Sequence, residues 1–92
     1  MKIKNMTSHN GNKVANQFII EDDNGNQFFQ SYNTVIVKKD WSGERLQIVL
    51  DHDSWDYSVT TGKYRNLFLG ETKRETESKI ASGEYKLDNL ND

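Results

Sequence analysis

The sequence contains no cysteine, no proline and no long apolar run. Without cysteine the chain can form neither a disulfide framework nor a thiolate site, a composition that suits the cytosol. No apolar segment approaches the roughly 18 residues that cross a bilayer. The first residues, MKIKNMTSHN, also lack the apolar core of a signal peptide. We therefore expect neither a disulfide scaffold, nor a cysteine enzyme, nor a membrane protein.

A large excess of one charge is also missing. The chain has 12 basic and 14 acidic residues, which give a formal charge of −2. This is neither the basic excess of a duplex-DNA-binding protein nor the strong acidity of a nucleic-acid mimic. The 92 residues, of which 34% are apolar, suffice for one domain (1–92) with one modest core. The free energy of unfolding should therefore lie at the low end of the usual range of about 5–15 kcal/mol.

What the sequence does contain is a series of β-rich runs separated by turn residues. The pair Asn24-Gly25 lies in one such region, NQFIIEDDNGNQFFQSY, and both residues tolerate the positive φ of a two-residue type I′ turn. With this turn, Ile20 would face Phe29 across the two strands. The alternating apolar residues of TVIVKK and LQIVLD continue the pattern. Residues 1–51 are thus predicted to form an antiparallel meander of four or five strands.

Two helices are predicted to follow the meander. The first spans residues 60–69, with Thr60 as its N-cap and Gly70 as the glycine that ends it. The second spans residues 73–82; TKRE is a capping box at its start, and Gly83 ends it. The tail EYKLDNLND would supply an edge strand or a packed strap. The predicted fold class is α+β, an antiparallel four- to five-stranded β-meander packed on one face by two C-terminal helices.

The first helix carries the clearest packing pattern of the chain. Val59 and Tyr64 occupy the two positions of a hydrophobic staple around the predicted N-cap. The buried stripe of this helix would then consist of apolar residues at three- and four-residue spacing, namely Tyr64, Leu67 and Phe68.

The start of the same helix also contains two residues that packing does not explain. Gly62 in the first turn costs about 1 kcal/mol relative to alanine. Lys63 stands where the helix dipole favours an acid. A first turn with free amides, hydroxyls and basic side chains is a candidate binding site for an anion or a partner. Its residues are Thr60, Thr61, Gly62, Lys63 and Arg65. In the competing interpretation, Asp56 neutralises Lys63 and Gly62 lets Trp55 pack closely.

The acidic segment DHDSWD raises the possibility of a metal site. In a continued strand Asp51 and Asp53 would point to one side and His52 to the other, so the three could not share one ion. A calcium loop needs glycine at its sixth position, where Asp56 stands. We therefore expect no metal and no cofactor, and a solvated turn in which Asp53 or Asp56 bonds to backbone amides.

Catalytic motifs are not recognisable. TTGKY lacks the glycine that a phosphate-binding loop carries five positions before Gly62, and Lys63 is not followed by serine or threonine. Neither His9 nor His52 has the local setting of a catalytic base. We expect no enzyme.

Two kinds of binding surface remain open. Aromatic residues on or beside the sheet could stack on the bases of a single-stranded nucleic acid, although no basic groove accompanies them and core positions are the better interpretation. These aromatics are Phe28, Phe29, Tyr32 and Trp41. Acidic loops could instead meet a basic channel of a protein partner. Their residues are Glu21, Asp22, Asp23, Asp51, Asp53 and Asp56.

The segments NQF, FFQSYNT, WDYS and TTGKYRNLFLG, in this order, resemble a family of small proteins of unknown function from phages and prophages of Gram-positive bacteria. The resemblance runs from about residue 11 to residue 87. It carries no catalytic residues over to this chain. It implies a small phage accessory protein in the host cytoplasm that binds and inhibits a host protein, such as a CRISPR effector nuclease. A phage protein that binds single-stranded nucleic acid is the alternative.

Overall fold

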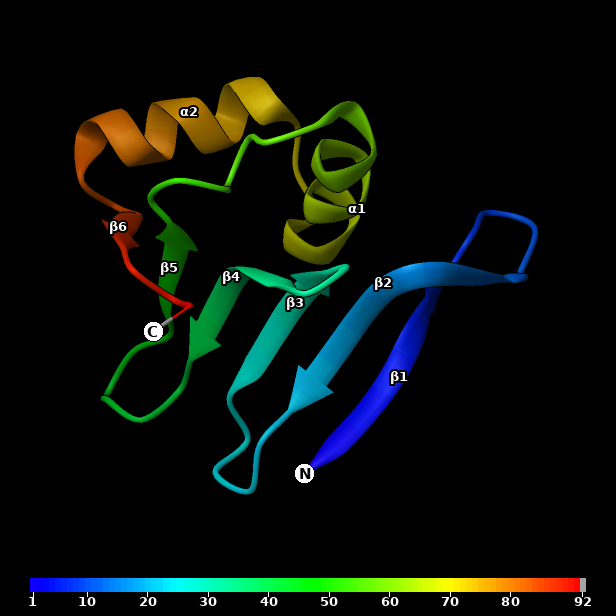
Figure 1. Cartoon of the computed structure of the whole chain (residues 1–92). Helices are drawn as coiled ribbons and strands as arrows, with labels where there is room; N and C mark the ends of the chain where they lie inside the picture. Colours follow the sequence, from blue (N-terminus) through cyan, green and yellow to red (C-terminus); the bar gives the residue numbers. More distant parts are fainter. Residues whose placement is uncertain (92) are drawn as a thin grey trace.

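The computed structural model describes residues 1–91. Within these residues six strands lie side by side in chain order in one sheet (Figure 1). Five strands pair antiparallel: β1 (Lys2–Thr7), β2 (Lys13–Glu21), β3 (Gln27–Ser31), β4 (Thr34–Asp40) and β5 (Gln47–Asp51). The tail supplies β6 (Lys86–Asp88), which pairs with β5 in parallel. The meander is confirmed, and the edge-strand interpretation of the tail accounts for the sixth strand.

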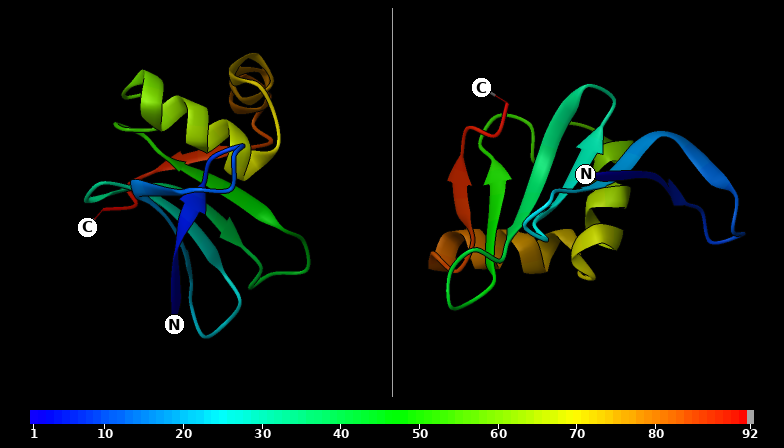
Figure 2. Two further views of the ribbon diagram at one scale, coloured as in Figure 1. Left: turned by 90° about the vertical axis from the view of Figure 1, so that its right-hand side faces the viewer. Right: turned by 90° about the horizontal axis from the view of Figure 1, so that it is seen from below.

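Two helices, α1 (Val59–Leu69) and α2 (Lys73–Ser82), lie over one face of the sheet (Figure 2). In residues 1–91 the opposite face of the sheet carries no helix. The tip of the β1–β2 hairpin extends past α1, on the side away from α2 (Figures 1 and 2). The α+β fold with two C-terminal helices on one face is confirmed. Neither helix of the described chain is long and apolar enough to cross a membrane.

The β2–β3 turn differs from the predicted type I′ turn. The Asp22 N–H donates to the Asn26 carbonyl (3.0 Å), so three residues form the loop instead of two. Of these three only Gly25 has a positive φ, +83°. The Asp22 carboxylate accepts from the Asn24 and Asn26 amides at 2.9 Å each, which stabilises the longer loop. A type I turn followed by a left-handed glycine is the usual three-residue hairpin loop.

The longer loop shifts the strand register by one residue. Ile19, not Ile20, lies opposite Phe29, and Ile20 lies opposite Phe28. The predicted pairing of Ile20 with Phe29 was therefore wrong. The shift decides which residues face the helices, since neighbouring residues of a strand point to opposite faces. Phe29 is fully buried under α1, and Phe28 lies on the helix-free face.

Helix α1 begins at Val59, one residue before the predicted span, and the predicted N-cap Thr60 was wrong by two residues. Ser58 is its N-cap, because its hydroxyl oxygen accepts from the Thr61 N–H at 3.1 Å. Val59 is then the first helical residue, and its side chain is 91% exposed, so the predicted staple with Tyr64 does not form. Gly70 ends the helix with a φ of +71°, as predicted.

Helix α2 has the predicted bounds and the predicted capping box. The Glu75 N–H donates to the Thr72 hydroxyl (3.2 Å), and the Thr72 N–H donates to the Glu75 carboxylate (3.1 Å). Gly83, with a φ of +84°, ends the helix.

The core lies between the sheet and α1. Phe29, Ile36, Val37 and Leu50 are fully buried, and Tyr64 and Phe68 of α1 pack on them. The predicted stripe was wrong at Leu67, which is 56% exposed. Because Tyr64 and Phe68 define the inward face, the residues one turn before them point inward too. The buried face of α1 consists of Thr61, Gly62, Tyr64, Arg65 and Phe68.

Candidate functional site

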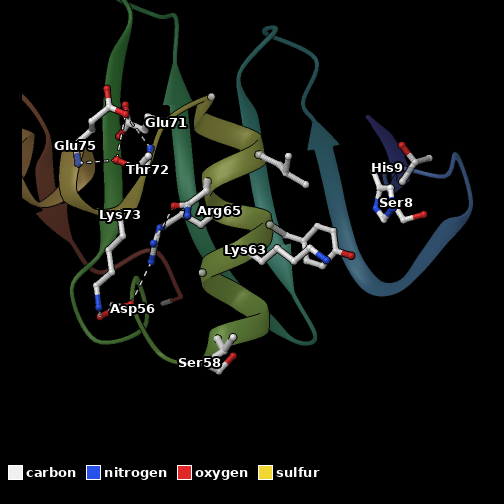
Figure 3. A pocket seen from close by; sticks show the side chains of 17 residues that line it. Ser8, His9, Asp56, Ser58, Lys63, Arg65, Glu71, Thr72, Lys73 and Glu75 are labelled. Carbon is white, nitrogen blue, oxygen red and sulfur yellow. Dashed lines mark hydrogen bonds and ion pairs between the residues drawn. The ribbon is translucent and has the colours of Figure 1, made fainter.

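A groove of about 1330 Å³ runs along α1. One wall is the β1–β2 loop with Ser8 and His9, and another is the start of α2 with Lys73 (Figure 3). Helix α1 lies between these walls and contributes most of the lining. The α1 residues that line the groove are Val59, Gly62, Lys63, Tyr64, Arg65, Asn66 and Leu67.

The outer face of α1 presents an apolar ridge with one charge in its middle. Val59, Lys63 and Leu67 follow at four-residue spacing and therefore share one face of the helix. Val59 is 91% exposed and Leu67 56% exposed, so neither contributes to the core. Within residues 1–91 Lys63 forms no ion pair; its ammonium group lies 5.5 Å from the ring centre of Tyr64. We name these three residues the α1 ridge.

Arg65, predicted as a binding residue, points inward and is fully buried. One terminal nitrogen of its guanidinium donates to the Trp55 carbonyl (2.6 Å), and the other donates to the Asn66 side-chain oxygen (3.0 Å). The guanidinium carbon lies 5.3 Å from the ring centre of Trp55. Arg65 thus connects α1 to the loop before it, and we assign it a structural role.

Asp56 neutralises two cations, neither of them Lys63. It lies 2.7 Å from the Lys73 ammonium and 3.4 Å from the Arg65 guanidinium (Figure 3). The hydrogen bond from Lys73, joined by the charge of Arg65, lowers the pKa of the Asp56 carboxyl. The competing interpretation therefore has the right acid but the wrong cation, because Arg65 is the base that α1 turns toward the loop.

Gly62 lies against Arg65 and lines the groove. A β-carbon at this position would stand 3.6 Å from a guanidinium nitrogen of Arg65, which is an ordinary van der Waals contact. The fold thus has room for alanine here. The competing interpretation held that Gly62 lets Trp55 pack closely. The nearest atoms to a β-carbon at position 62 belong to Arg65, so close packing of Trp55 does not explain the glycine.

Gly62→Ala is therefore expected to raise the free energy of unfolding by about 0.5–1 kcal/mol, because alanine favours the helix and restricts the unfolded chain. Urea unfolding followed by tryptophan fluorescence measures this change. A decrease in stability would show that the glycine is a packing requirement.

The five residues predicted at the helix start do not share one surface. Lys63 and Thr60 are exposed, whereas Thr61, Gly62 and Arg65 are buried. The Thr61 hydroxyl lies 3.0 Å from that of Ser31 in β3. The Thr61 and Gly62 amides donate to Ser58, which leaves fewer free donors for an anion than predicted.

The predicted acidic residues form two groups at opposite ends of the sheet (Figure 1). One group lies at the β2–β3 loop, where Asp22 bonds to loop amides and Asp23 pairs with the N-terminal ammonium group at 2.6 Å. The other follows β5. There Asp51 is buried and accepts from the Leu90 N–H at 3.0 Å, whereas Asp53 pairs with His52 at 2.9 Å. The binding role of these residues stays a prediction.

Metal ligands do not gather in the described part of the chain. Between residues 1 and 91 no three side chains of histidine, cysteine, aspartate or glutamate are placed to hold one ion. Asp51 turns inward to the tail, and His52 stays at the surface beside Asp53.

A buried polar network at Glu71, which no motif of the sequence predicted, joins the connection between the helices, α2 and the tail. The Glu71 side chain is 4% exposed and accepts from Lys79 (2.8 Å), the Tyr85 hydroxyl (2.7 Å) and the Thr76 hydroxyl (2.5 Å). Burial raises the pKa of the Glu71 carboxyl, but these three donors outweigh it and leave the pKa lowered. Burial and the bond to Glu71 raise the pKa of Tyr85 to about 12. The only signal in the sequence was an acid between Gly70 and the capping box.

The sheet aromatics do not form one exposed platform. Phe29 is fully buried, and Phe28 is half-buried on the helix-free face, with the Lys38 ammonium 5.8 Å from its ring centre. Tyr32 is 50% exposed and Trp41 is 51% exposed. These two lie at opposite ends of β4, because Tyr32 precedes that strand and Trp41 follows it.

A family model matches residues 1–84, which is most of the chain. The chain belongs to this family, described as a family of unknown function (DUF8033). The match spans the sheet from β1 to β5 and both helices, so the groove along α1 lies within the DUF8033 region. Neither a curated protein nor a solved structure matches the chain.

Proposed function

We propose that this DUF8033 protein is a non-enzymatic binding protein, and that a host protein docks on the groove along α1. The observation that carries the proposal is the α1 ridge. Val59 and Leu67 are exposed and line a large groove, whereas the core consists of other residues. Exposed apolar side chains that share one face are typical of a protein–protein interaction site, whose rim is usually polar or charged.

The phage setting and the class of target rest on the resemblance of the sequence segments to small phage proteins. On that ground we propose a phage accessory protein that acts in the host cytoplasm by steric inhibition. The class of target to test first is a CRISPR effector nuclease. In this mechanism the chain inhibits its target by covering part of the target's surface, and no catalytic group of the chain takes part.

The experiment is capture of a host protein by the tagged chain, compared between wild type and the double variant Val59→Asp/Leu67→Asp. Two charges placed on an apolar interface are expected to weaken binding by at least about 30-fold, the usual effect of losing an interface hot spot. The affinity of the captured protein for the wild-type chain and for the double variant is then measured by calorimetry. If the captured protein is a nuclease, its activity is assayed with increasing amounts of the chain.

The double variant should keep its fold, because both side chains are exposed. Glu77→Lys is a suitable control, since Glu77 is an exposed residue of α2 outside the groove. It should bind as the wild type does. Equal capture by the wild type and the double variant, or no specific capture at all, would refute the proposal.

Single-stranded nucleic acid is the second candidate, favoured by the exposed Trp41 and Tyr32 and by Phe28 beside Lys38. A labelled oligonucleotide whose binding weakens steeply with salt would favour it. Such binding should then fall with Trp41→Ala and not with the double variant of the α1 ridge.

A further inference from the structure

The first strand forms one edge of the sheet and has a free side. β1 pairs only with β2 within the described residues, so its outer side presents backbone N–H and C=O groups that no strand uses. Exposed edges of this kind can accept an added strand from another chain.

The two faces of β1 differ in chemistry. Lys4 lies opposite Ile19, a residue that packs on the core, so Lys2 and Lys4 both point to the helix side. Both lysines are exposed, and within residues 1–91 neither forms an ion pair. Lys2 lies opposite Glu21 in the strand register without a salt bridge to it. The helix side of this edge therefore carries two positive charges that could pair with acidic side chains of another chain.

Ile3 lies on the helix-free face and is 63% exposed. It begins a row of directly paired residues that continues through Ile20 and Phe28. The outward faces of antiparallel sheets that meet solvent are usually polar, so an apolar row that ends at a bare edge is unusual. A further strand beside β1 would extend this row and cover Ile3.

We propose that β1 is the docking site for an extended segment of a partner protein in which acidic and apolar residues alternate. The acidic side chains of the added strand would face Lys2 and Lys4, and its apolar side chains would continue the row from Ile3. Opposite charges on neighbouring strands are stabilising and like charges are destabilising. The two lysines of β1 should therefore favour an acidic strand over a basic one. This proposal concerns a different surface from the α1 groove and stands independently of it.

A second copy of this chain does not fit the edge. Antiparallel pairing of β1 with another β1 would bring lysines of both copies together, and like charges opposite each other are destabilising. Edge lysines commonly prevent such self-association. The same two lysines thus disfavour a homodimer and favour an acidic strand.

The test uses two labelled peptides, one of alternating glutamate and valine and one of alternating lysine and valine. The glutamate peptide should bind the wild-type chain and lose at least about tenfold in affinity with Lys2→Glu/Lys4→Glu. The lysine peptide should bind only that double variant. Lys13→Glu is the control, because it reverses one lysine charge in β2, half the charge change of the double variant, and it should leave the affinity unchanged within about twofold.

Fluorescence anisotropy gives the affinities, and amide NMR signals locate the peptide. Changes confined to β1 and its neighbour β2 would support the proposal. It would be overturned if the glutamate peptide fails to bind at millimolar concentration, if it binds all variants equally, or if the signals that change belong to α1.

Discussion

Replacing Arg65 by alanine is expected to lower the free energy of unfolding by about 3–5 kcal/mol. The substitution removes a fully buried side chain and leaves a cavity against Trp55. It also removes the donors to the Trp55 carbonyl and to Asn66. In a chain with a small core, this loss should bring the variant close to unfolding at room temperature. Urea unfolding followed by tryptophan fluorescence measures it.

Arg65→Lys keeps the charge and tests the geometry. A single ammonium group cannot reach both acceptors that the planar guanidinium bonds, so we expect a loss of about 1–3 kcal/mol. Arg74→Ala is the control, since Arg74 is exposed on α2 and should change stability by less than about 0.5 kcal/mol. If Arg65→Ala were as stable as Arg74→Ala, the structural role of Arg65 would be wrong.

A second large loss of stability is expected when Glu71 is replaced. Glu71→Ala should lower the free energy of unfolding by about 2–4 kcal/mol, because it leaves the buried Tyr85 hydroxyl without its acceptor and Lys79 without its counter-ion. The loss should appear in thermal and urea unfolding alike. Glu77→Ala, an exposed acid of α2, should change stability by less than about 0.5 kcal/mol.

The Glu71 network also predicts a dependence on pH. The pKa of the Glu71 carboxyl is lower in the folded chain than the ordinary value of 4.5. Its contribution is therefore fully present above pH 4.5 and is lost as the pH falls through the folded pKa. The stability difference between wild type and Glu71→Gln should shrink as the pH is lowered from 7 toward 3. A difference that stays constant over this range would contradict an ionised, hydrogen-bonded Glu71.

Local signals predicted most of the fold. The capping box of α2 and the glycines that end both helices were predicted correctly, because each acts through bonds between residues close in sequence. The strands of the meander followed from their alternating apolar residues. The register of the β2–β3 hairpin was missed by one residue, because the Asp22 side chain stabilises a three-residue loop where Asn24-Gly25 suggested two.

The site depended on the direction in which α1 faces, and the apolar pattern of this helix predicted that direction incorrectly. Leucine, tyrosine and phenylalanine at helical spacing favoured Leu67 as a core residue and Arg65 as a surface residue. The Ser58 cap and the contacts of Thr61 and Arg65 place the helix with Arg65 inside and Leu67 outside. Hydrophobicity alone misses this exchange, because a buried arginine becomes favourable only when its acceptors, such as the Trp55 carbonyl, lie within reach.

The groove itself could not be predicted from the sequence. Its walls are residues 7–9, helix α1 and the start of α2, which only the folded chain brings together. Lys63 was singled out because it breaks the usual charge rule at a helix start, and it does lie in the α1 ridge. Its apolar neighbours Val59 and Leu67 had been assigned to packing, and their exposure turns the same segment into a candidate interface.

The most direct test of the central claim is an amide NMR map of the isotope-labelled chain, recorded with and without the host protein that the wild-type chain captures. If the host protein docks on the groove along α1, the signals changed by binding will cluster on Val59, Lys63 and Leu67 and on the hairpin loop across the groove. The buried Arg65 and Phe29 should keep their contacts, and their signals should change little. Changes confined to the helix-free face of the sheet would contradict docking on the groove along α1.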